Sequence, residues 1–437
     1  MLYMTDLIER LPGYSGKLPS KTYGGYIDIG NGKNNYYIFI EAEKNASKAP
    51  IFFWTNGGPG CSGLMGLFEE LGPYRHTRSG KLKYNPYTWT KFANIVFIEQ
   101  PIGVGFSWSK DKKNYSSNDD ISAKDNLKFI LQFFIKYPQF KKNKLYLTSE
   151  SYGGHYVPLW AREIIKYNYK NDVSINLKGI MIGNPYVDYL SGTSAQIESY
   201  WGNQMIRKKL WDKYTKKRCN KLENNKKWRK TWKANKCQEL SYNIEDSVGK
   251  HNPYALGYPV CVSDQQNSLI AFFKKRNKTR KRMYTPCIDK FTKKYLNRND
   301  VQKAIHAKKI RNNWKPCSDI SHYTYKDTYK TSVPIINNML NDKHLKNLHV
   351  LIMSGTADSI CGTVGTQKWI GQLDIREIDI WKQYKINREP AGYVSKYKGE
   401  GKKKFTFITV NGAGHEVPLY KPEVAYTIMK NFINNKY

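Results

Sequence analysis

The sequence has few acidic residues for its length. Of its 437 residues, 36 are Asp or Glu and 72 are Lys or Arg, which gives a formal net charge of +36 at pH 7. Such an excess indicates either a generally basic, solvated surface or a surface that contacts a polyanion such as nucleic acid. The sequence contains no helix-turn-helix, zinc-finger or aromatic RNA-binding signature. We therefore favour the generally basic surface and keep non-specific polyanion contact as the alternative.

Long hydrophobic runs are also lacking. No apolar run approaches the roughly 20 residues that a membrane-spanning helix needs, so we expect no membrane span. The first residues, MLYMTDLIERLPGY, lack the apolar core of a secretory signal. Hydrophobic residues nevertheless make up 40% of the chain and aromatic residues 14%. That is enough for a sizeable core in two or three average domains, or in one large domain with a long insertion, and it excludes wholesale disorder.

Cysteine pairs with metal-binding spacing are absent. The seven cysteines include no Cys-x-x-Cys pair and the eight histidines show no metal-ligand spacing, so we expect neither a metal nor a structural zinc site. Six widely spaced cysteines can form three disulfides, which implies an oxidising compartment during folding. Sequons at Asn45, Asn114 and Asn277 agree with that compartment. The absence of a signal segment points the other way, so the location stays open.

The first part of the chain does contain short apolar runs, and their pattern indicates alternating strands and helices. Strands are expected at 51–54 and 94–99, which are short apolar runs bounded by Gly or Pro, and also at 144–148 and 179–183. A helix is expected between Asp119 and Pro138 because apolar residues recur there every three or four positions. Asp119 or Asp120 can cap this helix, and Pro138 stops it.

The pattern changes between residues 186 and 298. Strand signals fade there, Lys, Asn and Trp accumulate, and four of the seven cysteines appear. This composition indicates an insertion that is braced by disulfides because its own core is thin. The densest basic run, Lys274–Arg282, lies within it. The run is either an exposed, protease-sensitive loop or a patch for nucleic acid.

The alternation of strands and helices resumes after the insertion, with strands expected at 350–353 and 405–410. We therefore predict an α/β fold whose core has two parts, residues 1–185 and 299–437, separated by an insertion at 186–298.

A serine follows the strand at 144–148 in the arrangement of a nucleophile elbow. In Ser149-Glu150-Ser151-Tyr152-Gly153-Gly154 a tight turn lifts the Ser151 hydroxyl clear of the sheet, and small neighbours let strand and helix pass closely. Asp358 follows a later strand, and His415 a still later one. This chain order is that of an α/β-hydrolase triad, in which His415 accepts the serine proton and Asp358 fixes and stabilises the imidazole. The alternative is a helix-capping Asp358 and an ordinary loop histidine, and the ordered trio favours the triad.

A glycine-rich loop follows the strand at 51–54. Its consecutive glycines, Gly57 and Gly58, let backbone N–H groups approach a substrate closely. The Gly58 N–H can pair with the Tyr152 N–H to form an oxyanion hole. The alternative is an ordinary Gly/Pro turn.

Four blocks of sequence resemble the serine carboxypeptidases, the family of carboxypeptidase Y and the plant serine carboxypeptidases. The resemblance begins at Leu11 and reaches almost the last residue. The four blocks are Asn56–Ser62 (NGGPGCS), Gln100–Ser107 (QPIGVGFS), Glu150–Pro158 (ESYGGHYVP) and Gly412–Pro418 (GAGHEVP). The resemblance implies an α/β-hydrolase fold, with a mostly parallel central sheet flanked by helices and with the insertion as a cap. It implies no cofactor.

The resemblance also implies roles for single residues. It gives the triad Ser151, Asp358 and His415 and the oxyanion hole Gly58 and Tyr152. It places the substrate's C-terminal carboxylate in a network of Trp54, Asn56, Gly57, Glu70 and Glu150. The family pairing of cysteines is Cys61–Cys317, Cys219–Cys237 and Cys261–Cys287, with Cys361 free near Asp358.

Two positions depart from the family pattern. Ser149 stands where the family has Gly, which adds a Cβ where strand and helix converge and tightens the elbow. Thr356 stands where an acidic residue is usual. Neither departure removes a reacting group, so activity is still expected.

The implied function is a serine-type carboxypeptidase that removes C-terminal amino acids from peptides through an acyl-enzyme. One alternative is the acyltransferase branch of the family, whose members tend to carry Asp where this chain has Glu150. Another is an idle hydrolase fold that binds a polyanion through its basic surface. The family and the cysteines suggest a secretory, vacuolar or lysosomal, or extracellular location.

Three glutamates predict pH dependence and specificity. Glu150 must be protonated to bind a substrate carboxylate, and Glu70 can share that proton. Because His415 must be neutral to act as a base, peptidase activity is expected to peak on the acid side of neutrality. Glu416, beside His415, is expected to place a negative charge at the pocket of the leaving residue, so that Lys and Arg are tolerated there beside apolar residues. The alternative is that Glu416 faces solvent or pairs with a lysine.

Overall fold

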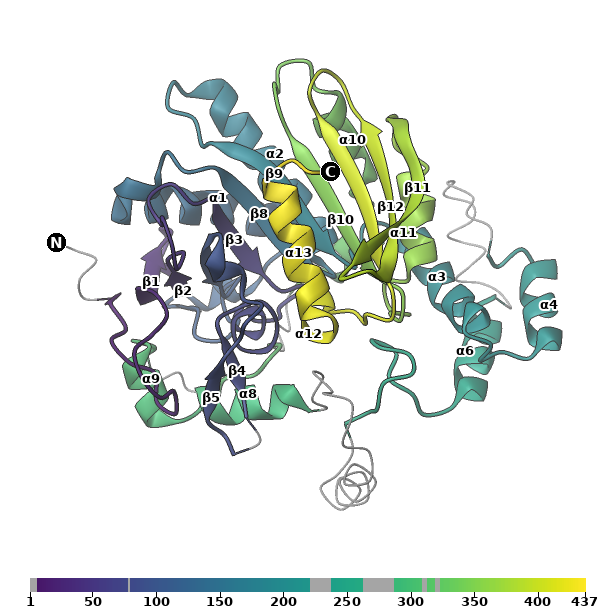
Figure 1. Cartoon of the computed structure of the whole chain (residues 1–437), viewed down its shortest axis with the longest axis horizontal. Coiled ribbons are helices and arrows are strands. Elements are labelled where there is room, and N and C mark those ends of the chain that lie inside the picture. Colours follow the sequence, from purple (N-terminus) through teal and green to yellow (C-terminus); the bar gives the residue numbers. More distant parts are fainter. Residues whose placement is uncertain (1–5, 78, 221–236, 262–286, 309–312, 319–322) are drawn as a thin grey trace.

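A large twisted sheet with helices on both faces forms the body of the protein (Figure 1). The computed structural model describes residues 6–77, 79–220, 237–261, 287–308, 313–318 and 323–437. The basic run Lys274–Arg282 and the sequon at Asn277 lie outside the described residues.

The sheet has parallel strands in its centre and antiparallel hairpins at its edges. Its strand order is β1-β2-β6-β3-β8-β9-β10-β13-β12-β11, with the short β7 (Trp108–Ser109) paired to β2. The central parallel strands are β6 (Asn94–Ile98), β3 (Ile51–Thr55), β8 (Leu145–Glu150), β9 (Leu177–Gly183), β10 (His349–Gly355) and β13 (Lys404–Val410). The edge hairpins are β1 (Thr22–Asp28) with β2 (Lys33–Ile40), and β11 (Arg376–Ile386) with β12 (Glu389–Lys398). A separate small sheet joins β4 (Tyr74–His76) to β5 (Leu82–Tyr84).

Burial explains why the central strands could be read from the sequence. Every residue of β3, β6 and β10 is buried, because helices pack on both faces of a parallel sheet and leave no solvated side. The six predicted strands all form, and the predicted α/β-hydrolase fold is confirmed.

Helix α1 (Asp119–Lys136) covers one face of the sheet beside α2 (Gly153–Lys170). The prediction that Asp119 or Asp120 caps α1 is wrong, since the cap is Asn118, whose side chain accepts a hydrogen bond from the Ile121 N–H. Asp119 is instead buried inside the protein. The expected stop is present, because α1 ends immediately before Tyr137 and Pro138.

The remaining helices lie around the sheet and beside it. They are α3 (Tyr189–Gly202), α4 (Lys208–Lys216), α6 (Cys237–Val248), α8 (Ile288–Leu296), α9 (Asn299–Ala304), α10 (Val333–Asn341), α11 (Thr363–Ile370), α12 (Val417–Tyr420) and α13 (Pro422–Ile433). In the described part of the chain, no helix is long and apolar enough to cross a membrane.

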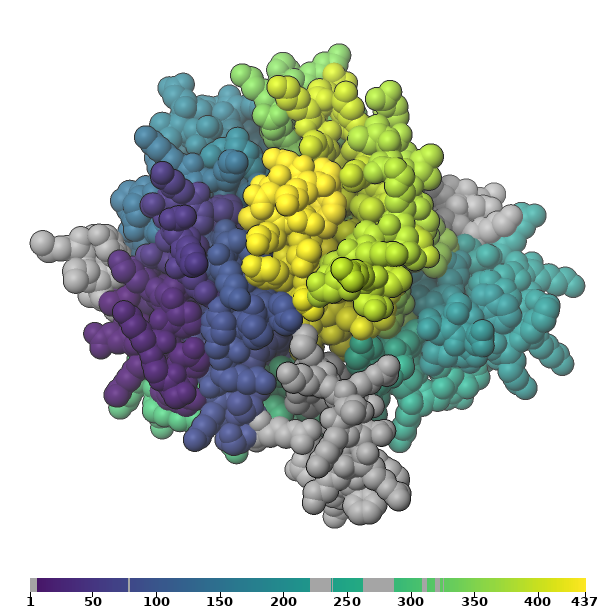
Figure 2. Space-filling view, in the orientation of Figure 1, coloured from purple at the N-terminus to yellow at the C-terminus, as the bar shows by residue number. Residues whose placement is uncertain are grey.

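The helices of the region predicted as an insertion pack in two different places. The α3–α6 segment has a small apolar cluster of its own, centred on Ile197, Tyr214 and Ile244, and it protrudes on one side of the molecule (teal in Figure 2). In contrast, α8 packs against the turn of helix η2 (Gly66–Glu70) and against β4. The predicted boundaries at 186 and 298 stay a prediction.

The three disulfides have the pairing that the resemblance implied. They join Cys61 to Cys317, Cys219 to Cys237 and Cys261 to Cys287, and Cys361 is a buried free thiol. The first one closes a separation of 256 residues and ties the glycine-rich loop to the chain after the insertion.

Candidate active site

Ser151 occupies a strained turn between β8 and α2. Its φ is +57°, in the left-handed region that non-glycine residues rarely adopt. Its N–H donates to the Gly183 carbonyl (3.0 Å), and its own carbonyl accepts from the N–H groups of Gly154 (2.9 Å) and Tyr186 (2.8 Å). These bonds hold the turn from both sides and place Ser151 at the carboxyl end of β8, as a nucleophile elbow requires.

Asp358 and His415 meet at the carboxyl ends of β10 and β13. The His415 Nδ1 lies 2.7 Å from Asp358 Oδ2, and both side chains are buried. The Asp358 carboxylate also accepts hydrogen bonds from the Asn184 amide (2.8 Å) and from the Ile360 N–H (2.9 Å). The carboxylate is thereby fixed in the orientation that holds the imidazole.

Cys361 lies close to both the serine and this pair. Its Sγ, the Asp358 carboxylate and a ring nitrogen of His415 all lie within 4.8 Å of one another, and a hydrogen bond from Ser151 acts on the thiol. Burial, followed by the charge of Asp358, raises the pKa of this thiol well above its usual range, which keeps the thiol neutral. The structure therefore brings His415 and Asp358 into direct contact, and the neutral Cys361 thiol is a neighbour that this pair shares with Ser151.

Burial and Asp358 act in opposite directions on the pKa of His415. Burial lowers this pKa, but the neighbouring carboxylate raises it more, to about 9. The charges of Glu416 and Glu70 add to the rise. An imidazolium formed here is thus strongly stabilised, as the general-base role requires.

The glycine-rich loop after β3 touches the elbow directly. A Cβ on Gly57 would lie 2.6 Å from the Tyr152 backbone nitrogen and 2.7 Å from the Ser151 Cβ, so only glycine allows this approach. Gly58 follows with φ of +113°. The two segments predicted to supply the oxyanion hole, at Gly58 and Tyr152, are therefore adjacent.

Ser149, which departs from the family pattern, is accommodated by its neighbours. Its hydroxyl donates to the Thr55 carbonyl at 2.7 Å. A Cβ on Gly153 would lie only 2.2 Å from the Ser149 Oγ. The added side chain therefore fits because residue 153 is glycine, and it adds a hydrogen bond between β8 and β3.

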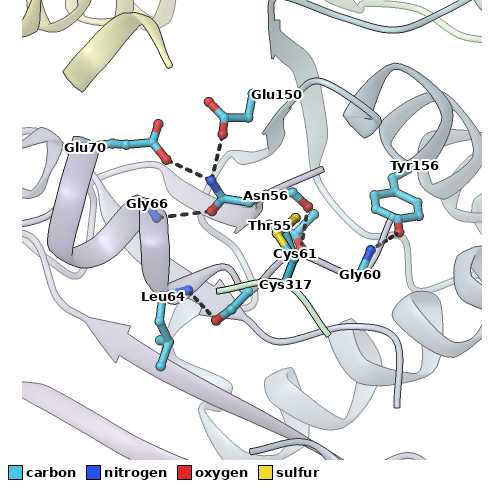
Figure 3. Close-up of a disulfide and its surroundings, with 11 residues drawn as sticks. Thr55, Asn56, Gly60, Cys61, Leu64, Gly66, Glu70, Glu150, Tyr156 and Cys317 are labelled. Carbon is cyan, nitrogen blue, oxygen red and sulfur yellow. Dashed lines mark hydrogen bonds between the residues drawn. A yellow bond between two sulfur atoms is a disulfide. The ribbon is translucent and has the colours of Figure 1, made fainter. Parts of the chain in front are cut away.

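Asn56 links two buried carboxyl groups. Its amide nitrogen donates to Glu70 Oε1 (2.8 Å) and to Glu150 Oε1 (2.7 Å), as Figure 3 shows. Its amide oxygen accepts from the Trp54 indole (2.8 Å) and from the Gly66 N–H (3.1 Å), which fixes the direction of the amide. The predicted network of Trp54, Asn56, Glu70 and Glu150 is thus one hydrogen-bonded unit, with Gly57 beside it.

These carboxyl groups are held largely neutral. Burial, and then the charge of Glu416, raise the pKa of Glu70 to about 7. Burial, and then the charges of Glu70 and Glu416, raise the pKa of Glu150 well above its usual range. A hydrogen bond also joins the two carboxyl groups. The pair can therefore hold a proton between its members, as two close carboxyl groups do when both cannot ionise.

Glu416 lies directly before α12 and close enough to influence the ionisation of Glu70 and Glu150. Its side chain is half-buried. Within the described ranges no lysine or arginine forms an ion pair with it, so the lysine-paired alternative finds no support there.

A second buried histidine–carboxylate pair lies behind the elbow and was missed by the sequence analysis. Asp119 Oδ1 accepts from the hydroxyls of Tyr152 (2.9 Å) and Tyr323 (2.6 Å), and Asp119 Oδ2 lies 2.9 Å from His155 Nδ1. The rings of Tyr152 and His155 stack with centroids 4.7 Å apart. Burial opposes ionisation of Asp119, but its bonds, led by the one with His155, bring the pKa below the usual range. An ionised Asp119 thus anchors the side chain of the residue after Ser151.

Asn184 is the other missed residue. Besides donating to Asp358, it accepts the Gly355 N–H at 2.9 Å, so it holds the carboxyl ends of β9 and β10 together. Its place directly after a predicted strand at 179–183 was the available signal, because polar side chains at such positions point to the functional edge of the sheet.

Comparison with known proteins agrees with this geometry. The serine carboxypeptidase family model matches residues 12–435. Serine carboxypeptidase 24 of Arabidopsis thaliana is 33% identical, with 99% of this chain and 92% of the relative covered. Serine carboxypeptidase-like 25 of the same plant is 31% identical with the same coverage.

Among solved structures, the prohormone-processing carboxypeptidase Kex1(delta)p of Saccharomyces cerevisiae has the same fold. The TM-score is 0.79 at 22% identity, covering 99% of this chain and 96% of that one. The family match over nearly the whole chain, the relatives above 30% identity and the shared fold lead to one conclusion. The chain belongs to the serine carboxypeptidase family.

Proposed function

We propose that the protein is a serine carboxypeptidase that removes C-terminal amino acids from peptides. The single observation that carries the proposal is the position of a neutral carboxyl pair, Glu70 and Glu150, directly beside the Ser151 elbow. A hydrolase of esters or internal peptide bonds has no need for such a group. A carboxypeptidase needs it to recognise the free carboxylate at the end of its substrate.

The proposed reaction uses Ser151, His415 and Asp358 in the triad roles. His415 takes the Ser151 proton as the hydroxyl attacks the last peptide carbonyl, and it gives that proton to the departing amino group. Asp358 stabilises the imidazolium formed in between, at 2.7 Å from its Nδ1. Water then attacks the acyl-enzyme by the same route and releases the shortened peptide.

The oxyanion would be bound by the N–H groups of Gly58 and Tyr152. The close approach of Gly57 to the Tyr152 nitrogen supports this assignment, since it brings the two segments within reach of one oxygen. The positive end of α2, which begins at Gly153, points to the same place.

The substrate carboxylate would be bound by Asn56 together with the Glu70–Glu150 pair. Asn56 can donate through its amide, and a protonated Glu150 can donate its own O–H. An ionised Glu150 would repel the substrate instead. Peptide binding is therefore expected to weaken as the pair loses its proton.

The pKa of His415 bears on the acidic optimum that the sequence predicted. A pKa near 9 in the free enzyme delays formation of the neutral base as pH rises, which opposes an optimum far on the acid side. Part of that rise comes from the charges of Glu416 and Glu70, and protonation of these groups removes it. We therefore propose no fixed pH optimum. We propose instead that, as pH rises, peptide hydrolysis declines at a lower pH than hydrolysis of a blocked ester.

Glu416 is proposed to lie at the pocket of the leaving residue, where its charge lets Lys and Arg be accepted beside apolar residues. Its position directly after His415 and the absence of an ion pair with Lys or Arg within the described ranges support this proposal. Burial raises its pKa, and the charge of His415 opposes the rise.

The test is incubation with N-blocked dipeptides, wild type beside Ser151→Ala, with the released amino acid measured. We expect release by the wild type and loss of release in the variant, with unchanged circular dichroism. Turnover by Ser151→Ala would place the nucleophile elsewhere. Acyl transfer from a sugar ester, with no amino acid released from peptides by the wild type, would assign the protein to the acyltransferase branch instead.

A further inference from the structure

A lysine-walled hollow lies at the end of the sheet opposite the active site. Its volume is about 610 Å³, and six of its fourteen lining residues are lysines, with no Asp or Glu among them. The lysines are Lys144, Lys178, Lys398, Lys402, Lys403 and Lys404. In Figure 1 this end of the sheet lies at the top, near the label C, whereas α12, which follows His415, lies at the other end.

The hollow is built from the first residues of the parallel strands. Lys144 precedes β8, Lys178 is in β9 and Lys404 begins β13. The catalytic residues follow the last residues of these or adjacent strands, so a strand length of roughly 20 Å separates the two places. Lys398 ends β12, which is hydrogen-bonded to β13 with Lys398 opposite Lys404. The sheet therefore holds these cations side by side.

Most of the lysines are available to a ligand. None of the six forms an ion pair with a residue in the described ranges, and Lys144, Lys398, Lys402 and Lys404 are exposed while Lys178 is half-buried. Lys403 differs, because it is buried and its ammonium donates to the carbonyls of Asp342 (2.8 Å) and Leu345 (3.1 Å). Five ammonium groups without a carboxylate partner thus surround one concave site, where their fields add.

The floor of the hollow contains an unpartnered polar group. His349 is 6% exposed. Its Nε2 lies 2.9 Å from Thr406 Oγ1, whereas its Nδ1 has no hydrogen-bond partner in the described part of the chain. Burial, and then the charge of Lys404, lower the pKa of His349 to about 3, so the ring is neutral. Tyr146 also lies on the floor. The site thus combines a polar floor with a cationic wall.

We propose that this hollow binds a compact anion that carries several phosphate groups. Ammonium groups bind phosphate as point charges, and several of them spaced around a cavity match several phosphates on a small ring or chain. The volume is that of a small-molecule pocket. A concave site of this size admits a free polyphosphorylated molecule or the headgroup of a phosphorylated lipid.

The test measures binding of inositol hexakisphosphate to the full chain by calorimetry at several salt concentrations. The pocket variant is Lys398→Gln/Lys402→Gln/Lys404→Gln. The matched control is Lys110→Gln/Lys112→Gln/Lys113→Gln, which removes the same charge from exposed positions that do not line the hollow. A second pocket variant, Lys144→Gln/Lys178→Gln, tests the opposite wall. Vesicles with and without phosphatidylinositol bisphosphate show whether a lipid headgroup is also bound.

We expect saturable binding at one site, weakened at least tenfold in either pocket variant and less than twofold in the control. Peptidase activity should be the same in all variants, since no pocket lysine lies near Ser151. Vesicle binding lost in the pocket variants would identify the lipid headgroup as a source of the ligand and would support the proposal. Equal weakening in pocket and control variants, or binding of neither probe, would overturn it and leave only the non-specific attraction of a +36 chain.

Discussion

At one end of the parallel strands, carboxyl groups gather in a buried site, whereas at the other end lysines surround an open hollow. Glu70, Glu150 and Asp358 are all at most 5% exposed at the first end. At the second end, four of the five available lysines are exposed. Both groups are carried by one sheet within one strongly basic chain, so net charge says little about the electrostatics of a particular site.

The two ends of the sheet differ in how strongly their ligand-binding groups depend on pH. At the carboxyl end, burial raises the pKa of Glu70 and Glu150 and makes them proton carriers that can accept an anionic substrate end. At the amino end, most of the ammonium groups face solvent, and their attraction for anions is screened by salt. We therefore expect ligand binding at the first end to depend strongly on pH, and at the second end to depend mainly on salt.

Removal of the carboxylate that holds His415 should have the largest effect. Asp358→Asn keeps the shape of the side chain but can no longer stabilise a charged His415. We expect kcat for peptides and for esters to fall by about 10⁴, measured under saturating substrate. A loss of less than tenfold would remove Asp358 from the triad.

Removal of the Cys61–Cys317 disulfide at the catalytic end should have the next largest effect. Cys61→Ser/Cys317→Ser releases a loop of 256 residues, and we expect the free energy of unfolding to fall by about 3–5 kcal/mol in denaturant titrations. Cys361→Ser is the control and should lose far less stability. Thiol counting on the denatured wild type should find one free cysteine, and a count of seven would refute the disulfides.

Substitution of Asp119 tests whether catalysis depends on the buried hydrogen bonds that hold the Tyr152 side chain. In Asp119→Asn the bonds to Tyr152, Tyr323 and His155 lose their ionic partner, so Tyr152 is less firmly held. We expect kcat to fall by about 10–100-fold with KM changed less than about twofold, measured well below the unfolding temperature.

Asp120→Asn is the matched control for this experiment. Asp120 is the next residue, its side chain is 55% exposed, and it pairs with Arg162 on the surface. Its substitution should leave kcat unchanged and cost less than about 1 kcal/mol of stability. If kcat in Asp119→Asn fell only in proportion to the folded fraction, Asp119 would be structural and not a positioning residue.

The smallest effect is expected from Glu416→Met. Loss of one half-buried charge should lower the ratio of C-terminal Lys release to C-terminal Leu release by about 3–10-fold. The measurement is that ratio at fixed pH in wild type and variant. An unchanged ratio would exclude Glu416 from specificity.

The sequence predicted the centre of the fold better than its edges. The parallel strands are continuous apolar runs because both of their faces are buried. In contrast, β11 reads REIDIWKQYKI and is largely exposed, so it lacks the continuous apolar run by which the central strands were predicted. The lysines of the hollow could not be recognised in the sequence either, because they come from three strands and two loops in a chain where lysine is common.

The residues of the candidate site were also predicted only in part. Ser151, Asp358 and His415 could be predicted because each follows a strand within a recognisable block. Asp119 was taken for a helix cap, which is the usual role of Asp beside a helix start. Its real partners are Tyr152, His155 and Tyr323, up to 204 residues away in sequence, and only the folded chain brings them together.

The central claim is that a neutral glutamate pair recognises the substrate carboxylate beside the Ser151 elbow. It is tested most directly by the pH dependence of kcat/KM for one blocked dipeptide and for the corresponding blocked ester, in wild type and in Glu150→Gln. In the wild type, we expect the peptide-to-ester ratio to fall as pH rises, approaching about tenfold per pH unit once the pair has lost its proton. In Glu150→Gln the ratio should vary much less with pH. Identical profiles for peptide and ester in the wild type would contradict the claim.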